Sequence, residues 1–143
     1  MKKAIIMLLT VTTLLSCFTI FSSAEDAEIT PRYSNVNSAN VSFAITETGL
    51  AAVDVSYFGK PGITTQVKSE IYLQKKVLGL FWQKVNIGTT DNVWIDYSTN
   101  CDGGFFHSFQ LSDTGTYRAV VEITFSGTGG TPDVISDKYQ DNW

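Results

Sequence analysis

Residues 111–125 read LSDTGTYRAVVEITF, and this stretch gives the strongest local indication of the fold. Its first half predicts a tight turn. The side chain of Asp113 can accept hydrogen bonds from backbone amides two residues further on, and Gly115 tolerates a positive φ. In its second half apolar side chains recur at every second position, which is typical of a strand with one buried face; they are Tyr117, Ala119, Val121, Ile123 and Phe125.

The same period of two recurs along most of the chain. We expect strands at about 41–45, 51–57, 67–73, 81–87, 93–97, 105–111, 117–125 and 133–139, with Gly, Pro, Asn and Asp between them. No segment has a helical period. Strands with one apolar and one polar face form antiparallel sheets with one side in water, so two such sheets must bury their apolar faces against each other. The sequence therefore predicts an all-β, antiparallel β-sandwich of about eight strands.

Tyr117 opens the strand that follows the turn, and its inward-facing hydroxyl group needs a backbone partner across that turn. This arrangement resembles the tyrosine corner of immunoglobulin-like domains, at the start of their strand F. Antibody-type domains have a bridging cysteine two residues after the tyrosine, whereas this chain has Ala119 there and no cysteine at 50–58. The resemblance implies an immunoglobulin-like (Ig-like) sandwich without an intradomain disulfide.

Four further stretches, read together, resemble an uncharacterised family of short secreted proteins from Gram-positive bacteria. They are FGKPGITT at 58–65, the lysine pair at 75–76 followed by FWQKV at 81–85, GTYR at 115–118 and GTGG at 127–130. The likeness spans roughly residues 31–140. It implies secretion and an Ig-like β-sandwich. That family has no assigned activity, so the resemblance transfers no site.

Residues 1–24 have a basic start, an apolar body and a small-residue end, which is the order of a secretory signal peptide cleaved before Glu25. Two alternatives are a retained transmembrane anchor, for which the apolar stretch is long enough, and a lipoprotein anchored through Cys17. We expect a signal peptide at 1–24, an extended N-terminal lead-in at 25–40 and the Ig-like domain at 41–143. The protein is then secreted and extracellular.

The mature chain is acidic. Lys2 and Lys3 are two of the ten basic residues and none of the 14 acidic residues precedes Glu25, so its net charge is about −6. A nucleic-acid partner is not expected, because the chain lacks a basic field that would displace counterions. Only Cys101 remains after cleavage, which predicts either a monomer with a free thiol or a Cys101-linked dimer.

The sequence offers no set of catalytic residues. His107, the only histidine, shares a strand face with Phe105, Phe109 and Leu111, which favours a structural, hydrogen-bonded role. One histidine and one cysteine cannot form a structural zinc site, and the aspartates at 91, 96 and 102 follow no calcium-loop spacing. We expect no enzymatic activity, no metal and no cofactor. The alternative is a small hydrolase that uses His107 and Cys101.

The best candidate for a binding surface is aromatic. Four aromatic side chains lie on the strand faces opposite the expected core residues: Tyr72, Trp82, Trp94 and Phe106. In the strand at 93–97 the expected core residues are Val93, Ile95 and Tyr97. Exposed together, the four aromatic side chains would form a contact or sugar-stacking patch, and the alternative is that they are buried by packing.

Two functions from different classes follow. The first is a secreted, non-catalytic Ig-like module that recognises a protein or glycan surface, with no membrane contact expected. The alternative is a secreted antagonistic protein, bacteriocin- or toxin-like, that acts on membranes through the hairpin at 75–85, where an apolar tip is flanked by lysines. In the first case Leu78 and Leu80 would fold back on the sheet edge.

Overall fold

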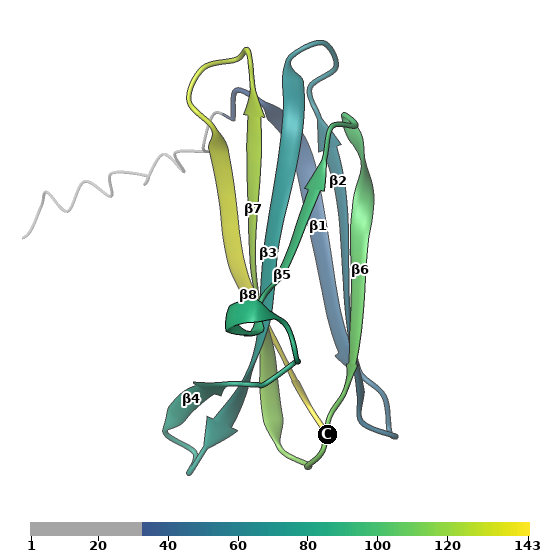
Figure 1. Ribbon diagram of the computed structural model, residues 1–143, viewed down its shortest axis with the longest axis vertical. Helices are drawn as coiled ribbons and strands as arrows, with labels where there is room; N and C mark the ends of the chain where they lie inside the picture. The colour runs from purple at the N-terminus through teal and green to yellow at the C-terminus, as the bar shows by residue number, and fades with distance from the viewer. Residues whose placement is uncertain (1–32) are drawn as a thin grey trace, which may run out of the picture. The chain divides into compact units, whose positions relative to one another are not determined.

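Eight antiparallel strands in two sheets make up residues 33–143, the part of the chain that the computed structural model describes (Figure 1). The predicted signal peptide and Cys17 lie outside these residues. One sheet has the order β1-β2-β6, with β1 at Val36–Ile45, β2 at Leu50–Gly59 and β6 at Asp102–Gln110. The other has the order β4-β3-β7-β8, with β4 at Phe81–Lys84, β3 at Thr64–Val77, β7 at Thr116–Gly127 and β8 at Asp133–Asn142.

The remaining strand, β5 (Trp94–Ser98), also pairs with β3, and a short 3₁₀ turn at Thr90–Asn92 precedes it. The prediction of an all-β, antiparallel sandwich is confirmed. Within residues 33–143 no helix is long and apolar enough to cross a bilayer. Cys101, the one cysteine in this range, is partly exposed and makes no disulfide there.

The core lies between the two sheets, where alternate side chains of β2, β3 and β7 meet. The fully buried positions include Val53 and Val55 from β2, Ile71 from β3 and Phe125 from β7. The ring of Phe125 meets the ring of Tyr57 from the opposite sheet edge-on, with 6.0 Å between the ring centroids. Burying each of these large apolar side chains stabilises the fold by about 1.5–3 kcal/mol, so the alternation seen in the sequence is the main source of the two-layer architecture.

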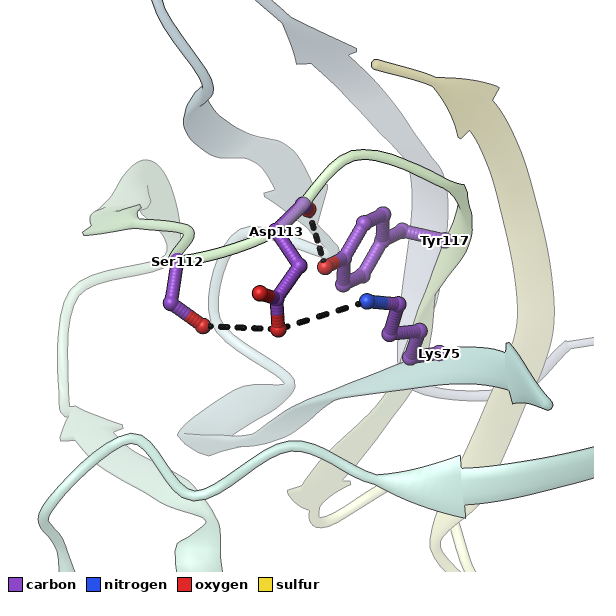
Figure 2. Close-up of polar contacts among 4 residues, drawn as sticks. All are labelled: Lys75, Ser112, Asp113 and Tyr117. Carbon is purple, nitrogen blue, oxygen red and sulfur yellow. Dashed lines mark hydrogen bonds and ion pairs between the residues drawn. The ribbon is translucent and has the colours of Figure 1, made fainter.

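The turn before β7 has the predicted tyrosine hydrogen bond, but the predicted role of the Asp113 side chain is wrong: the Gly115 amide donates to the carbonyl of Trp143, and the Asp113 carboxylate accepts from the Ser112 hydroxyl. The Tyr117 hydroxyl donates a hydrogen bond to the backbone carbonyl of Asp113 at 2.6 Å, and the tyrosine ring is buried (Figure 2). Gly115 has a positive φ of 151°. The backbone partner expected for this tyrosine is therefore present, four residues upstream.

The prediction of which β5 residues face the core is wrong. Ile95 and Tyr97 are at least half exposed, whereas Trp94 packs against the core. The reason is the pairing with β3, which sets Trp94 opposite Ile71 and Asp96 opposite the buried Ser69. Residues opposite each other in a ladder share a face, and a shift of one residue exchanges the two faces of the whole strand.

Two predicted boundaries also differ from the structure. The first strand begins at Val36, not at 41, and Asn35 and Val36 are both buried, so part of the expected lead-in belongs to the domain. Asp133 explains this, because its carboxylate accepts hydrogen bonds from the backbone amides of both residues. The fourth strand ends at Lys84, not at 87. Phe81, which the alternation at 81–87 sets on the face opposite Trp82 and therefore in the core, is exposed at the tip of the hairpin.

Candidate functional site

The four aromatic residues expected to form one surface lie in three places. Tyr72 and Trp82 are partly buried on the outer face of the five-stranded sheet. Phe106 is 64% exposed on the outer face of the other sheet, where it lies opposite Asp54. Trp94 faces the interior. The prediction of a single patch is therefore wrong, and only Tyr72 and Trp82 remain together.

Cations surround Tyr72 and Trp82. The Lys84 ammonium lies 4.4 Å from the Tyr72 ring centroid, and the Arg118 guanidinium carbon lies 4.0 Å from the Trp82 ring centroid. The Lys76 ammonium lies 5.8 Å from the same tryptophan ring. Such contacts favour a cation over the negative face of an aromatic ring. We refer to these five residues as the basic-aromatic face.

The strand registers explain this cluster. Lys76 lies opposite Trp82 in the β3–β4 ladder, and Gln74 lies opposite both Lys84 of β4 and Arg118 of β7. Two of the cations are also fixed by hydrogen bonds: Arg118 Nε donates to Gln74 Oε1 at 2.7 Å, and Lys84 Nζ donates to the carbonyl of Asp91 at 3.0 Å. The basic-aromatic face is therefore preorganised by the protein itself.

Positive charge is concentrated at this end of the molecule. Residues 33–143 contain seven Lys and Arg residues, and four of them are the three cations of the basic-aromatic face and the neighbouring Lys75. Among these four, the structure gives only Lys75 a carboxylate within salt-bridge distance, that of Asp113 at 3.4 Å. The result is a local basic region on an otherwise acidic chain.

The tip of the β3–β4 hairpin adjoins this region and is strongly apolar. Leu78 is 84% exposed, Leu80 75% and Phe81 64%. Leu78 also has a φ of 53°, a conformation that is uncommon for a branched apolar residue. Neither leucine folds back on the sheet edge, so that expectation is wrong. The hairpin projects from the sandwich at the lower left of Figure 1.

A shallow hollow of about 300 Å³ lies beside Tyr72 on the same outer face. Its rim includes Glu70 and Glu122, which lie directly opposite each other in the β3–β7 ladder. Lys68 forms an ion pair with Glu70 at 2.8 Å, and the hydrogen bond to that carboxylate raises the pKa of Lys68. The outer face is therefore basic at the hairpin end and acidic in the middle.

The single histidine lies between the sheets. Its Nε2 atom is 2.6 Å from Asp96 Oδ2, and its ring stacks on that of Trp94 with 4.8 Å between centroids. The inward orientation and hydrogen bond that the sequence predicts for His107 are confirmed. Within residues 33–143 no group of three His, Cys, Asp or Glu side chains could hold a metal ion.

The positions of the three cations over the Tyr72 and Trp82 rings were not predicted from the sequence. The sequence does indicate that Lys76 lies on the same face of its strand as Tyr72. The contacts of the cations with the rings, however, depend on the registers of β4 and β7 against β3. Comparison with family models finds no match for this chain, and comparison with curated proteins finds none either.

Proposed function

We propose that this chain is a secreted, non-catalytic Ig-like module that binds an acidic protein or glycan surface through the basic-aromatic face. Two features support an Ig-like fold. The order of the strands sets β1-β2-β6 against β4-β3-β7-β8, and Tyr117 makes the backbone hydrogen bond of a tyrosine corner. The composition of residues 1–24 and the resemblance to secreted Gram-positive proteins support secretion.

The observation that carries the proposal is the arrangement of three cations around two aromatic rings. Trp and Arg dominate the binding energy of many interfaces, since both combine a large contact area with a directional polar group. Here Arg118 already lies over Trp82, so a partner meets a planar, charged surface that needs little reordering. A carboxylated or sulfated partner complements its charge.

Binding to surfaces coated with poly-L-glutamate and with hyaluronate tests this proposal, and the surface that binds separates protein-like from glycan partners. We expect Trp82→Ala to weaken binding about tenfold and added salt to weaken it further. The matched control is Phe106→Ala, which removes an exposed aromatic side chain from the opposite face. Equal loss in both variants, or no binding by the unmodified protein, would contradict the proposal.

A second candidate function is action on membranes through the hairpin tip. Three exposed apolar side chains at the tip, with lysines and an arginine behind them, suit a surface of anionic lipid. Dye leakage from phosphatidylglycerol vesicles, compared with phosphatidylcholine vesicles, tests this function. We expect the double variant Leu78→Ser, Phe81→Ser to abolish leakage and Phe58→Ser, on the other sheet, to leave it unchanged. Leakage that survives the double variant would exclude the hairpin.

A further inference from the structure

A cavity of about 240 Å³ opens at one end of the sandwich, between the end of β3, the segment after β4 and the β6–β7 turn. Figure 2 shows four residues of its wall: Lys75, Ser112, Asp113 and Tyr117. We refer to this cavity as the end pocket. Pockets for drug-sized molecules measure about 300–1,000 Å³, so the end pocket has room for one small ring.

The polar side chains at its rim are held in place, each by one atom. Gln110 Nε2 donates to the carbonyl of Thr48 at 2.8 Å, and Asn86 Oδ1 accepts from the Gly88 amide at 3.0 Å. Asp113 Oδ2 accepts from the Ser112 hydroxyl at 3.1 Å. Within residues 33–143 no partner is found for Asn86 Nδ2 or Asp113 Oδ1, so the rim offers one donor and one acceptor. Gln110 follows the inward-facing Phe109 in β6, and its side chain lies on the outer face of that strand.

One of the two ammonium groups at the end pocket is paired with a carboxylate, and the other is directed to the outer face of the sheet. Lys75 and Asp113 form an ion pair, while the Lys84 ammonium donates to the backbone carbonyl of Asp91 and lies over the Tyr72 ring. Burial alone would lower the pKa of Lys75, but the neighbouring Tyr117 and Asp113 outweigh it and raise that pKa, so the ammonium stays charged beside its partner. A charged ligand would have to break this pair, whereas a neutral one would not.

The floor of the end pocket is apolar. Phe109 and Val85 pack against the core, and Leu111 is buried. A polar rim above an apolar floor fits a molecule with one apolar face and hydroxyl groups at its edge. Each hydroxyl group both donates and accepts, which matches a rim that presents amide, carboxylate and hydroxyl groups side by side.

We propose that the end pocket binds a single neutral sugar residue, with the C–H face of the ring on Phe109 and Val85 and the hydroxyl groups on Asn86 and Asp113. This inference goes beyond the proposed function, because it concerns a neutral ligand and not an acidic surface. It uses a different surface from the basic-aromatic face, with which the end pocket shares only Lys84. Substitutions therefore separate the two.

The experiment is a titration of the ¹⁵N-labelled protein with D-glucose, D-galactose and N-acetyl-D-glucosamine, followed by amide chemical shifts. We expect saturable shifts for at least one sugar, confined to residues 85–87 and 109–113. Asn86→Asp keeps the acceptor for Gly88 and removes the free donor, and we expect it to weaken binding about tenfold. Gln66→Ala, an exposed amide near the start of β3, is the control and leaves binding unchanged.

Three results would overturn this inference. One is the absence of saturable shifts with all three sugars. Another is an equal response to sodium acetate, which would make the end pocket an anion site. The third is a set of shifts centred on Tyr72 and Trp82 that survives Asn86→Asp, a result that would support the basic-aromatic face and exclude the end pocket. The spectrum of each variant also reports whether it is folded.

Discussion

The two long edges of the sandwich are closed by different chemistry. Where β8 lies beside β1, the carboxylate of Asp133 accepts hydrogen bonds from the amides of Asn35 and Val36, and Asp141 Oδ2 accepts from the Ile45 amide at 2.8 Å. Where β5 faces β6, the polar contact between the sheets is the side-chain pair of His107 with Asp96, and the His107 ring also stacks on that of Trp94. We call these the β1/β8 seam and the β5/β6 seam.

The difference lies in what each seam must satisfy. At the β1/β8 seam the donors are backbone amides, which exist whatever the sequence and cost free energy when they are buried without an acceptor. At the β5/β6 seam both partners are side chains, so the polar contact exists only because both residues are present. The first seam is therefore a requirement of the fold, and the second is a local addition to it.

The largest expected effect is at the β1/β8 seam. Asp133→Ala leaves the amides of Asn35 and Val36 without their acceptor, and we expect it to lower the free energy of unfolding by about 2–4 kcal/mol. Urea denaturation measures this loss. Asp137→Ala removes an exposed carboxylate from the same strand and is the control, with a change below about 0.5 kcal/mol. Similar losses in the two variants would show that Asp133 stabilises the β1/β8 seam no more than an exposed carboxylate on the same strand does.

A double-mutant cycle measures the β5/β6 seam. His107→Ala, Asp96→Ala and the combined variant together give the coupling between the two side chains, which we expect to be about 1 kcal/mol. Both side chains are less than one-third exposed, so solvent screens the contact only in part. A coupling energy of zero would mean that stacking on Trp94 alone positions the histidine.

The sequence and the structure agree best where the information is local. The turn at 111–116 and the alternation of β7 lie within 15 consecutive residues, and both were predictable. The phase of β5 was not, since Ile95 and Tyr97 look like core residues until β3 fixes the register. Asp96 is tolerated on the inner face because His107, from the other sheet, accompanies it.

The candidate sites were less accessible to prediction than the fold. Tyr72 and Trp82 were identified, but the cations over their rings come from three strands whose pairing the sequence does not state. The end pocket is assembled from still more distant segments, with Asn86 and Gln110 more than 20 residues apart. Side chains that meet only through tertiary packing leave no periodic pattern to read.

A smaller effect on the free energy of unfolding is expected at an unsatisfied hydroxyl group beside the β5/β6 seam. Ser69 lies opposite Asp96, and its Oγ atom is buried without a hydrogen-bond partner in residues 33–143. Ser69→Ala removes this unsatisfied group, so we expect the free energy of unfolding to stay the same or to rise by up to about 1 kcal/mol. Thermal denaturation is a sufficient measurement. A loss larger than 1 kcal/mol would show that the hydroxyl group bonds across the seam in solution.

The smallest effect is a dependence on alkaline pH at β8. Burial raises the pKa of Tyr139, and the nearby Asp137 raises it further. The folded state therefore holds this proton more tightly than the unfolded state. Its contribution to stability is complete below the ordinary tyrosine value of 10.0 and is lost as the pH rises through the higher folded value. We expect Tyr139→Phe to flatten the decline in stability above pH 10; an unchanged slope would contradict this.

One consequence of the fold concerns self-association. The outer edge of β3, a strand of 14 residues, is shared by two short strands, β4 with four residues and β5 with five. An uninterrupted row of free amides and carbonyls is a template on which further chains can stack. Because β3 is covered in two separate pieces, this side presents only short and staggered rows to a neighbouring molecule, which makes growth of a fibril from it unfavourable.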